Sequence, residues 1–356
     1  MRRLASIVGA TVILLVSAAP ALACGGLIGP NGAVNLLRTT TFAGYHDGVE
    51  HYVTSFEFAG GEGEFGSIVP LPGVPTDVAR GGDWTLQRLL LETAAAEDFG
   101  FRALAAGELD DESAEVLLET KIDALEITIL RGGGDEVGLW AAEHGFRLPP
   151  DAPEVLEFYA ARSPIFMAAR FDAEEARRRG QQVGDGTPVH LTIPTDNPWV
   201  PLRILGLGKS AAETVQADVF LVTDEEPALL PDPGGLLGVR GMTLAHSAIA
   251  SEQLLDDLRS DKGMEWVPRS GWLTAINIDA AAPDLRFDLA IDASGHGRPS
   301  VEAAGLAPFI PPTEMPSGSS LWVPLAALAV ALPLASVVLV VLAARGRKGG
   351  RPLAGA

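Results

Sequence analysis

The segment that says most about the fold is residues 34–58, VNLLRTTTFAGYHDGVEHYVTSFEF. Two stretches rich in Thr, Val, Tyr and Phe flank the dipeptide Asp47-Gly48. β-branched and aromatic residues favour strands, and Asp-Gly is a preferred two-residue hairpin turn because both residues tolerate positive φ. We therefore expect strands over Val34–Tyr45 and Val49–Phe58, joined by a tight turn.

The tip of this hairpin carries the candidate metal ligands, His46 and His51. A two-residue turn pairs His46 with Val49 and Gly44 with His51, so the two imidazoles lie diagonally on one face, about 7–8 Å apart. Such a pair can share a metal ion, but no third ligand is present nearby on that face. Polar residues at an exposed tip are the ordinary alternative, and no cofactor is expected.

The rest of the chain alternates short strands and helices. We expect further strands at Phe65–Leu71, Ala124–Leu130, Ile165–Phe171, Val189–Ile193, Leu202–Leu205, Val215–Val222, Gly271–Asp279 and Leu285–Ile291. Helices are expected at Asp83–Ala106 (with Asp83 as its cap), Glu136–His144, Ala152–Arg162, Asp172–Arg179 and Thr243–Ser260. The first three strands should form a meander and the last two a hairpin, with Arg286, Asp288 and Asp292 pointing outward from the second. In residues 172–179, Glu174–Arg178 and Glu175–Arg179 have the spacing of helical ion pairs.

The fold class is therefore α+β, strand-dominated and mostly antiparallel, in an extracytoplasmic region that precedes one C-terminal transmembrane helix. That helix is expected at residues 321–344, LWVPLAALAVALPLASVVLVVLAA, which hold no charge and are long enough to cross a bilayer. The basic residues of the tail, 345–356, place it in the cytoplasm. The Pro-rich residues 308–320 form a semi-rigid spacer.

The N-terminus has the three parts of a secretory signal. A basic pair, Arg2-Arg3, precedes the apolar run Leu4–Val16 and the small-residue site Ala21-Leu22-Ala23, so residues 1–23 are predicted to be cleaved off. The exported domain is then 24–307, with a possible subdomain division near 229–241. These features predict a single-pass protein of the cell membrane with its N-terminal domain outside.

The charge and the cysteine content limit the functions that are possible for this chain. Residues 24–320 hold 20 Lys and Arg against 46 Asp and Glu, a formal charge of −26. Such a surface repels nucleic acid, and the expected partners are the membrane and an envelope protein or ligand. Cys24, the sole cysteine, is the predicted mature N-terminus; it is lipidated, free, or in an intermolecular disulfide.

The sequence holds no recognisable catalytic motif. It lacks a Gly-x-Ser-x-Gly elbow, and its glycine runs lack the Lys-Ser/Thr ending of a phosphate loop. We therefore expect a non-enzymatic protein whose ectodomain binds a partner or ligand. Two alternatives stay open: an envelope hydrolase whose carboxylate and His residues converge only in the fold, and a cation-binding surface protein centred on His46 and His51.

Several segments in order resemble a bacterial family known as domain of unknown function 2330. They are Cys24-Gly25, Phe65-Gly66-Ser67-Ile68-Val69-Pro70-Leu71-Pro72, Leu139-Trp140-Ala141-Ala142-Glu143-His144-Gly145-Phe146, Tyr159, Phe166-Met167-Ala168-Ala169, Pro201-Leu202-Arg203 and Trp272-Leu273-Thr274. The resemblance implies an exported protein, commonly with a C-terminal membrane anchor. It implies no activity, so no catalytic residue is carried over. Trp140 and Tyr159 are expected to pack in the core.

Overall fold

The computed structural model of this chain describes residues 26–29, 32–33, 39–57, 65–93, 116–181, 186–234, 239–294 and 297–306. By its internal contacts the chain divides into residues 1–307 and 308–356, and every described residue belongs to the first unit. No described helix has the length and apolar character needed to cross a membrane. The predicted signal, spacer, transmembrane segment and tail all lie outside the described residues.

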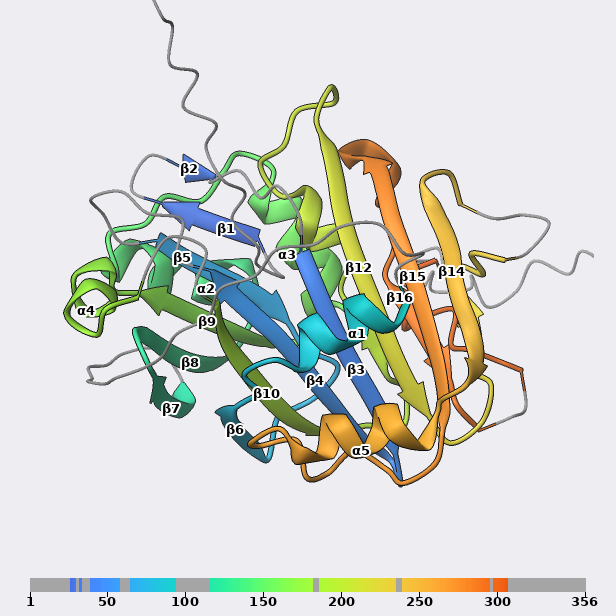
Figure 1. Cartoon of the computed structure of the whole chain (residues 1–356). Coiled ribbons are helices and arrows are strands. Elements are labelled where there is room, and N and C mark those ends of the chain that lie inside the picture. Colours follow the sequence, from blue (N-terminus) through green and yellow to red (C-terminus); the bar gives the residue numbers. More distant parts are fainter. Residues whose placement is uncertain are drawn as a thin grey trace, which may run out of the picture. The chain divides into compact units, whose positions relative to one another are not determined.

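The described strands form three sheets, drawn in Figure 1. The six-stranded sheet has the order β2 (Gly32–Ala33), β1 (Gly26–Gly29), β5 (Phe65–Pro70), β9 (Ile165–Phe171), β8 (Leu125–Arg131), β7 (Val116–Ile122). The seven-stranded sheet has the order β14 (Met242–Ile249), β15 (Trp272–Ala281), β12 (Thr214–Thr223), β3 (Thr39–His46), β4 (Val49–Glu57), β10 (Gly186–Pro194), β6 (Asp77–Arg80). The small sheet has the order β11 (Trp199–Val200), β16 (Leu289–Asp292), β13 (Ala228–Leu230).

The helices are short. They are α1 (Thr85–Thr93), α2 (Gly134–Glu143), α3 (Ala152–Ala160), α4 (Ala173–Arg178) and α5 (Glu252–Ser260), with 3₁₀ turns η1 (Arg203–Gly206) and η2 (Ala282–Asp284). Among the described strand pairs only β3 and β12 run parallel. The prediction of a strand-dominated, mostly antiparallel α+β fold is therefore confirmed for the described residues.

The hairpin at Asp47-Gly48 is confirmed with its register. His46 pairs with Val49 and Gly44 with His51, and both turn residues have positive φ, 49° and 78°. β3 and β4 lie in the interior of the seven-stranded sheet, where β12 and β10 pair with their outer edges. The hairpin thus places its side chains on both faces of a central pair of strands.

Both faces of that sheet are covered. On one face, residues such as Tyr52 and Leu191 join a large core with the six-stranded sheet. On the other, Phe42 and Val53 pack in a smaller core with α1 and α5, which lie over the same face of the sheet in Figure 1. Because β4 is buried on both sides, its alternate residues enter two different cores.

Trp140 on α2 and Tyr159 on α3 are both fully buried in the large core, as predicted from the sequence. Glu174–Arg178 and Glu175–Arg179 also form the predicted ion pairs, with N–O distances of 3.7 and 2.6 Å. Strands β8, β9, β10 and β12 and helices α2, α3 and α4 lie where the pattern placed them, within a few residues at their ends.

Several local predictions are wrong. Residues 243–260 are not one helix, because Ser251 caps α5 by accepting a bond from Leu254 N–H, and the residues before it form edge strand β14 on β15. Residues 202–205 are not a strand but part of the turn η1. The proposed meander does not form, because β5 pairs with β1 and β9 in the other large sheet.

The proposed closing hairpin does not form either. β15 pairs with β12 and β14, and η2 then turns the chain so that β16 joins the small sheet. Asp288, which alternation placed outward, is fully buried there. A short run of alternating residues does not specify which sheet supplies its main-chain partners.

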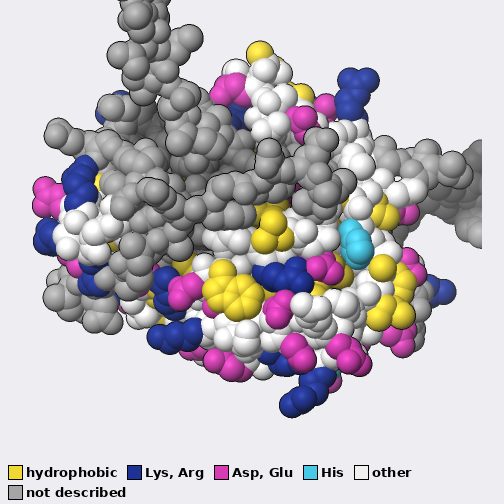
Figure 2. Space-filling model, in the orientation of Figure 1, with side chains coloured by type: hydrophobic (Ala, Val, Ile, Leu, Met, Phe, Trp, Pro, Cys, Tyr) yellow, Lys and Arg dark blue, Asp and Glu magenta, His cyan; other side chains and the backbone are white. Residues whose placement is uncertain are grey.

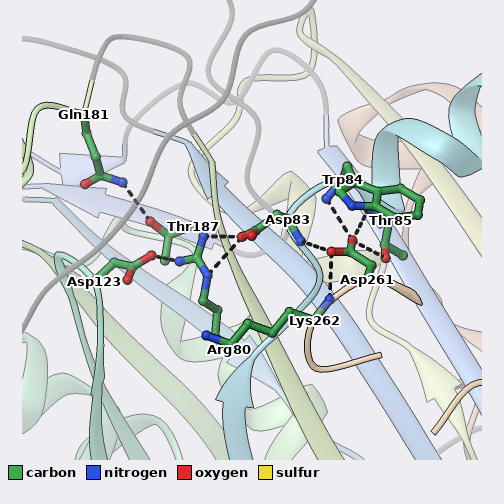
Figure 3. A network of polar contacts seen from close by, with 9 residues as sticks. All are labelled: Arg80, Asp83, Trp84, Thr85, Asp123, Gln181, Thr187, Asp261 and Lys262. Carbon is green, nitrogen blue, oxygen red and sulfur yellow. Dashed lines mark hydrogen bonds and ion pairs between the residues drawn. The ribbon is translucent and has the colours of Figure 1, made fainter. Parts of the chain in front are cut away.

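Helix α1 begins at Thr85, and Asp261, not Asp83, caps it. As Figure 3 shows, the Asp261 carboxylate accepts hydrogen bonds from Asp83 N–H, Trp84 N–H and Thr85 N–H at 2.9–3.0 Å and from the Thr85 hydroxyl at 2.8 Å. The Asp83 side chain instead pairs with Arg80, which also pairs with Asp123. The cap thereby ties the end of α5 to the start of α1.

Candidate functional site

His46, one of the two candidate metal ligands, lies on the exposed end of the hairpin. Its Nδ1 lies 2.6 Å from a carboxylate oxygen of Asp224, in the loop after β12, and its Nε2 lies 3.1 Å from Asp47. Both imidazole nitrogens therefore contact carboxylates. The side chains of His46 and Asp224 are about half exposed.

His51, the other candidate, contacts His190 of β10. The distance between His51 Nδ1 and His190 Nε2 is 2.9 Å. The indole of Trp266, in the loop between α5 and β15, lies parallel to His51 at a centroid distance of 4.1 Å. It lies 5.2 Å from His190 at an angle of 19°. The strand register keeps His46 and His51 diagonal on one face, and the structure adds His190 and Trp266 as the groups that His51 contacts.

Gly44, opposite His51 on β3, makes room for the indole. A Cβ atom at this position would lie 2.3 Å from a ring carbon of Trp266, which is too close for any side chain. Burial lowers the pKa of His51 to about 4 and of His190 to about 3, so both rings are neutral at neutral pH. Among the described residues, no three His, Cys, Asp or Glu side chains gather as a metal site. Cys24 lies outside them.

Glu50 lies on the opposite face of β4 and is completely buried. One carboxyl oxygen accepts a hydrogen bond from Trp199 N–H at 3.3 Å, and the other has no partner in the described structure. Burial raises its pKa from the ordinary 4.5 to about 8, against the opposite effect of the Trp199 bond. Glu50 is therefore protonated at neutral pH, a state that the sequence did not indicate.

The raised pKa of Glu50 predicts a pH dependence of stability. Between pH 4.5 and about 8 the folded chain holds a proton that the unfolded chain releases, so the free energy of unfolding falls as the pH rises. The stabilising effect is complete below pH 4.5 and is lost as the pH rises through about 8. Within that window, we expect the free energy of unfolding of wild type to fall by up to about 1.4 kcal/mol per pH unit relative to that of Glu50→Gln, whose side chain cannot ionise.

Urea unfolding of the two chains at pH 5, 6, 7 and 8 measures this difference. Glu143→Gln, which removes an exposed carboxylate on α2, is the matched control and should follow wild type at each pH. Parallel curves for wild type and Glu50→Gln would show that Glu50 is not protonated in the folded state.

A groove of about 630 Å³ lies beside the edge strand β14. Its walls come from β13 and the residues around it, from β14 and β15, and from the segment 297–299. Leu229, Leu230 and Leu244 supply apolar surface, while Glu226, Asp232 and Arg298 are exposed charges on its walls. This volume lies in the range of natural ligand sites.

Two hydroxyl groups face this groove from neighbouring strands. Ser247 accepts a hydrogen bond from the Trp272 indole at 2.9 Å and retains its own proton for another acceptor. Thr274 is 1% exposed, and its hydroxyl has no partner among the described residues. Buried polar groups are rarely left unpaired, so this hydroxyl is an exception among the residues that line the groove.

Strand β14 is an open edge of the seven-stranded sheet as far as the described residues extend. Among the described strands only β15 pairs with it, and its sequence, MTLAHSAI, holds no Lys, Arg, Asp, Glu or Pro. Leu244 is 37% exposed and Ile249 is 76% exposed. Figure 2 shows hydrophobic side chains at the right of this face, the side on which β14 lies in Figure 1. Sequence reasoning missed this edge because it read residues 243–260 as one helix.

The fold and the groove define a mixed α+β domain with an open edge strand beside a cleft. The family model described as an uncharacterized protein conserved in bacteria, DUF2330, matches residues 18–223, more than half of the chain. The chain belongs to this family, which confirms the resemblance seen in its motifs.

Two solved structures of baculovirus P35 are similar to part of this chain. A mutated P35 after caspase cleavage is 10% identical, with 71% of this chain and 98% of that chain covered and a TM-score of 0.37. A second P35 structure is 9% identical, with 72% and 95% covered and a TM-score of 0.36. TM-scores this low carry no argument about fold or function. The search of curated proteins found no match.

Proposed function

We propose that this chain is a non-enzymatic, membrane-anchored protein of the bacterial envelope whose exported domain binds a partner protein. The signal pattern of residues 1–23, the apolar residues 321–344 and the basic tail support the location, with residues 308–320 as a spacer. The partner contributes an extended peptide, which lies along β14 and places side chains in the adjoining groove. The open edge of β14 is the observation that carries this proposal.

An open edge strand binds peptides through its main chain. The N–H of Ala250, the residue after β14, donates to the Gly271 carbonyl on the β15 side. In an antiparallel ladder the N–H groups alternate in direction, so the N–H of Ile249 points to the free edge. Proteins usually protect such edges with charges, proline or a covering element. The uncharged β14 instead has the character of a strand that accepts another chain by β-augmentation.

The groove sets the chemistry of the peptide. Apolar side chains on alternate residues fit the surface of Leu229, Leu230 and Leu244. Two carboxylates, Glu226 and Asp232, stand against one cation, Arg298, so a Lys or Arg in the peptide is favoured. The hydroxyl of Ser247 adds a hydrogen-bonding position for a polar atom of the peptide.

Selection from a displayed library of random 12-residue peptides against the full-length chain tests the proposal. We expect enriched peptides with alternating apolar residues and at least one Lys or Arg. Ile249→Pro removes the outward N–H without breaking a bond to β15, and it should weaken binding of an enriched peptide by about tenfold or more. Fluorescence anisotropy with the synthetic peptide measures this.

Two variants distinguish the contribution of the Ile249 main-chain N–H to binding from that of its side chain. Ile249→Ser keeps the N–H and removes the apolar group, so it should bind more tightly than Ile249→Pro. Leu139→Ser, at a 61% exposed position on α2, is the control and should bind like wild type. The proposal fails if the selection enriches no peptide, or if Ile249→Pro binds as well as Ile249→Ser while both melt like wild type.

A further inference from the structure

The cluster of His51, His190 and Trp266 has a geometry that the peptide-binding proposal does not use. In the ladder between β4 and β10, His51 pairs with Thr192 and His190 pairs with Val53, so the two histidines are diagonal neighbours on one face. This is the face on which Val53 packs with α1 and α5. Two neighbouring strands of the sheet therefore hold the imidazoles in one fixed register.

The two imidazoles lie edge to edge. Each ring nitrogen is about 1.1 Å from its ring centre, so a straight N–H···N bond of 2.9 Å places the ring centres about 5.1 Å apart. The observed centroid distance is 5.1 Å, and the planes differ by only 23°. The facing nitrogens of His51 and His190 therefore point at each other along nearly one line.

Two collinear imidazole nitrogens are the ligand set of a two-coordinate d¹⁰ ion. Cu⁺ accepts this linear arrangement and binds imidazole well, whereas Zn²⁺ in proteins requires four ligands in a tetrahedron. Cu⁺ needs the two nitrogens about 3.8 Å apart, about 0.9 Å more than in the hydrogen bond. His51 is only partly buried, so rotation of its side chain can open this gap.

The indole of Trp266 favours a cation at this point. The plane of the indole makes an angle of 4° with the His51 ring and of 19° with the His190 ring. The face of the indole is therefore nearly parallel to both imidazoles. A cation close to the face of an indole is attracted by the ring electrons. A neutral imidazole carries one ring nitrogen with a free lone pair, which can bind a metal ion.

We propose that His51 and His190 bind one Cu⁺ ion between their facing nitrogens, next to the indole of Trp266. The proton of the present hydrogen bond moves to the other nitrogen of the same ring, so both rings stay neutral and no proton leaves the site. The ion replaces this hydrogen bond and enters without a change of oxidation state.

Anaerobic titration of the full-length chain with Cu⁺, in competition with a chromogenic Cu⁺ chelator, tests the proposal. The Cys24→Ser chain is used throughout, so that no thiol competes for the ion. We expect one Cu⁺ per chain and quenching of tryptophan fluorescence on binding. His51→Ala and His190→Ala should each weaken binding at least tenfold, and His46→Ala, at the hairpin tip, should bind like its parent.

X-ray absorption on the Cu⁺-loaded Cys24→Ser chain identifies the ligands of the ion directly. This measurement does not require that the histidine variants fold. Two nitrogen ligands near 1.9 Å with imidazole scattering are the expected result. Failure to take Cu⁺ from the chelator, sulfur in the first shell, or equal affinity in a folded His51→Ala chain would each overturn the proposal. So would equal loss in His46→Ala, since that places the ion at the hairpin tip.

Discussion

Replacing Asp288 with alanine should lower the free energy of unfolding by about 4 kcal/mol, because it removes the acceptor of a buried, charged hydrogen-bond network. One oxygen of the buried carboxylate accepts bonds from Tyr159 Oη at 2.8 Å, Leu202 N–H at 2.7 Å and Arg203 N–H at 3.1 Å. The other pairs with Arg162 Nη2 at 2.5 Å. Alanine leaves these donors, including a buried guanidinium, without their acceptor.

The cost is large because the partners cannot move to water. The Arg162 side chain is 8% exposed, and its guanidinium lies 4.1 Å from the ring centre of Phe158 and 5.0 Å from that of Trp199. Tyr159 is fully buried, and its hydroxyl also accepts the N–H of Ile204. The Asp288 carboxylate thus joins α3, η1 and the small sheet.

Urea unfolding of the full-length chain, followed by tryptophan fluorescence, measures the loss. Asp288→Asn keeps one acceptor oxygen and should lose less than Asp288→Ala. Asp284→Ala, in the turn η2 close by in the sequence and exposed, is the surface control. If Asp288→Ala unfolds within about 1 kcal/mol of wild type, the network does not hold these elements together.

Replacing Asp261 with alanine should lower the free energy of unfolding by about 3 kcal/mol. The carboxylate is 2% exposed and accepts three main-chain N–H bonds and one hydroxyl bond at the start of α1, together with Lys262 N–H at 3.0 Å. A negative charge at a helix N-terminus also interacts favourably with the helix dipole. Alanine removes all of these contacts and leaves the first turn of α1 without a cap.

Asp83→Ala is the matched control, because Asp83 is the residue that sequence spacing favours as the cap. Its side chain is 52% exposed and pairs with Arg80, which retains Asp123 as a partner. We expect Asp83→Ala to cause a small fraction of the loss seen in Asp261→Ala, since exposed ion pairs contribute little. Thermal melts compare the stabilities of the two variants. A larger loss of stability in Asp83→Ala would show that Asp83, and not Asp261, caps α1.

Elements with local signals could be predicted from the sequence. The Asp47-Gly48 hairpin, its register and the ion pairs of α4 depend on residues a few positions apart. The split of residues 243–260 into β14 and α5 could not be predicted in this way, although Ser251 is a recognisable cap. A short apolar pattern fits both a helix and a strand. Residues 242–249 form a strand because they pair with the edge of β15, which the local sequence does not show.

By itself the sequence determined the family, the strand-rich α+β class and the hairpin that carries His46 and His51. Only the tertiary structure decided what those residues contact. His51 meets His190 across 139 positions of sequence, and Asp261 reaches Thr85 across 176. The physical reason is that strand order sets which distant side chains share a face, and main-chain pairing, which carries little side-chain information, sets strand order.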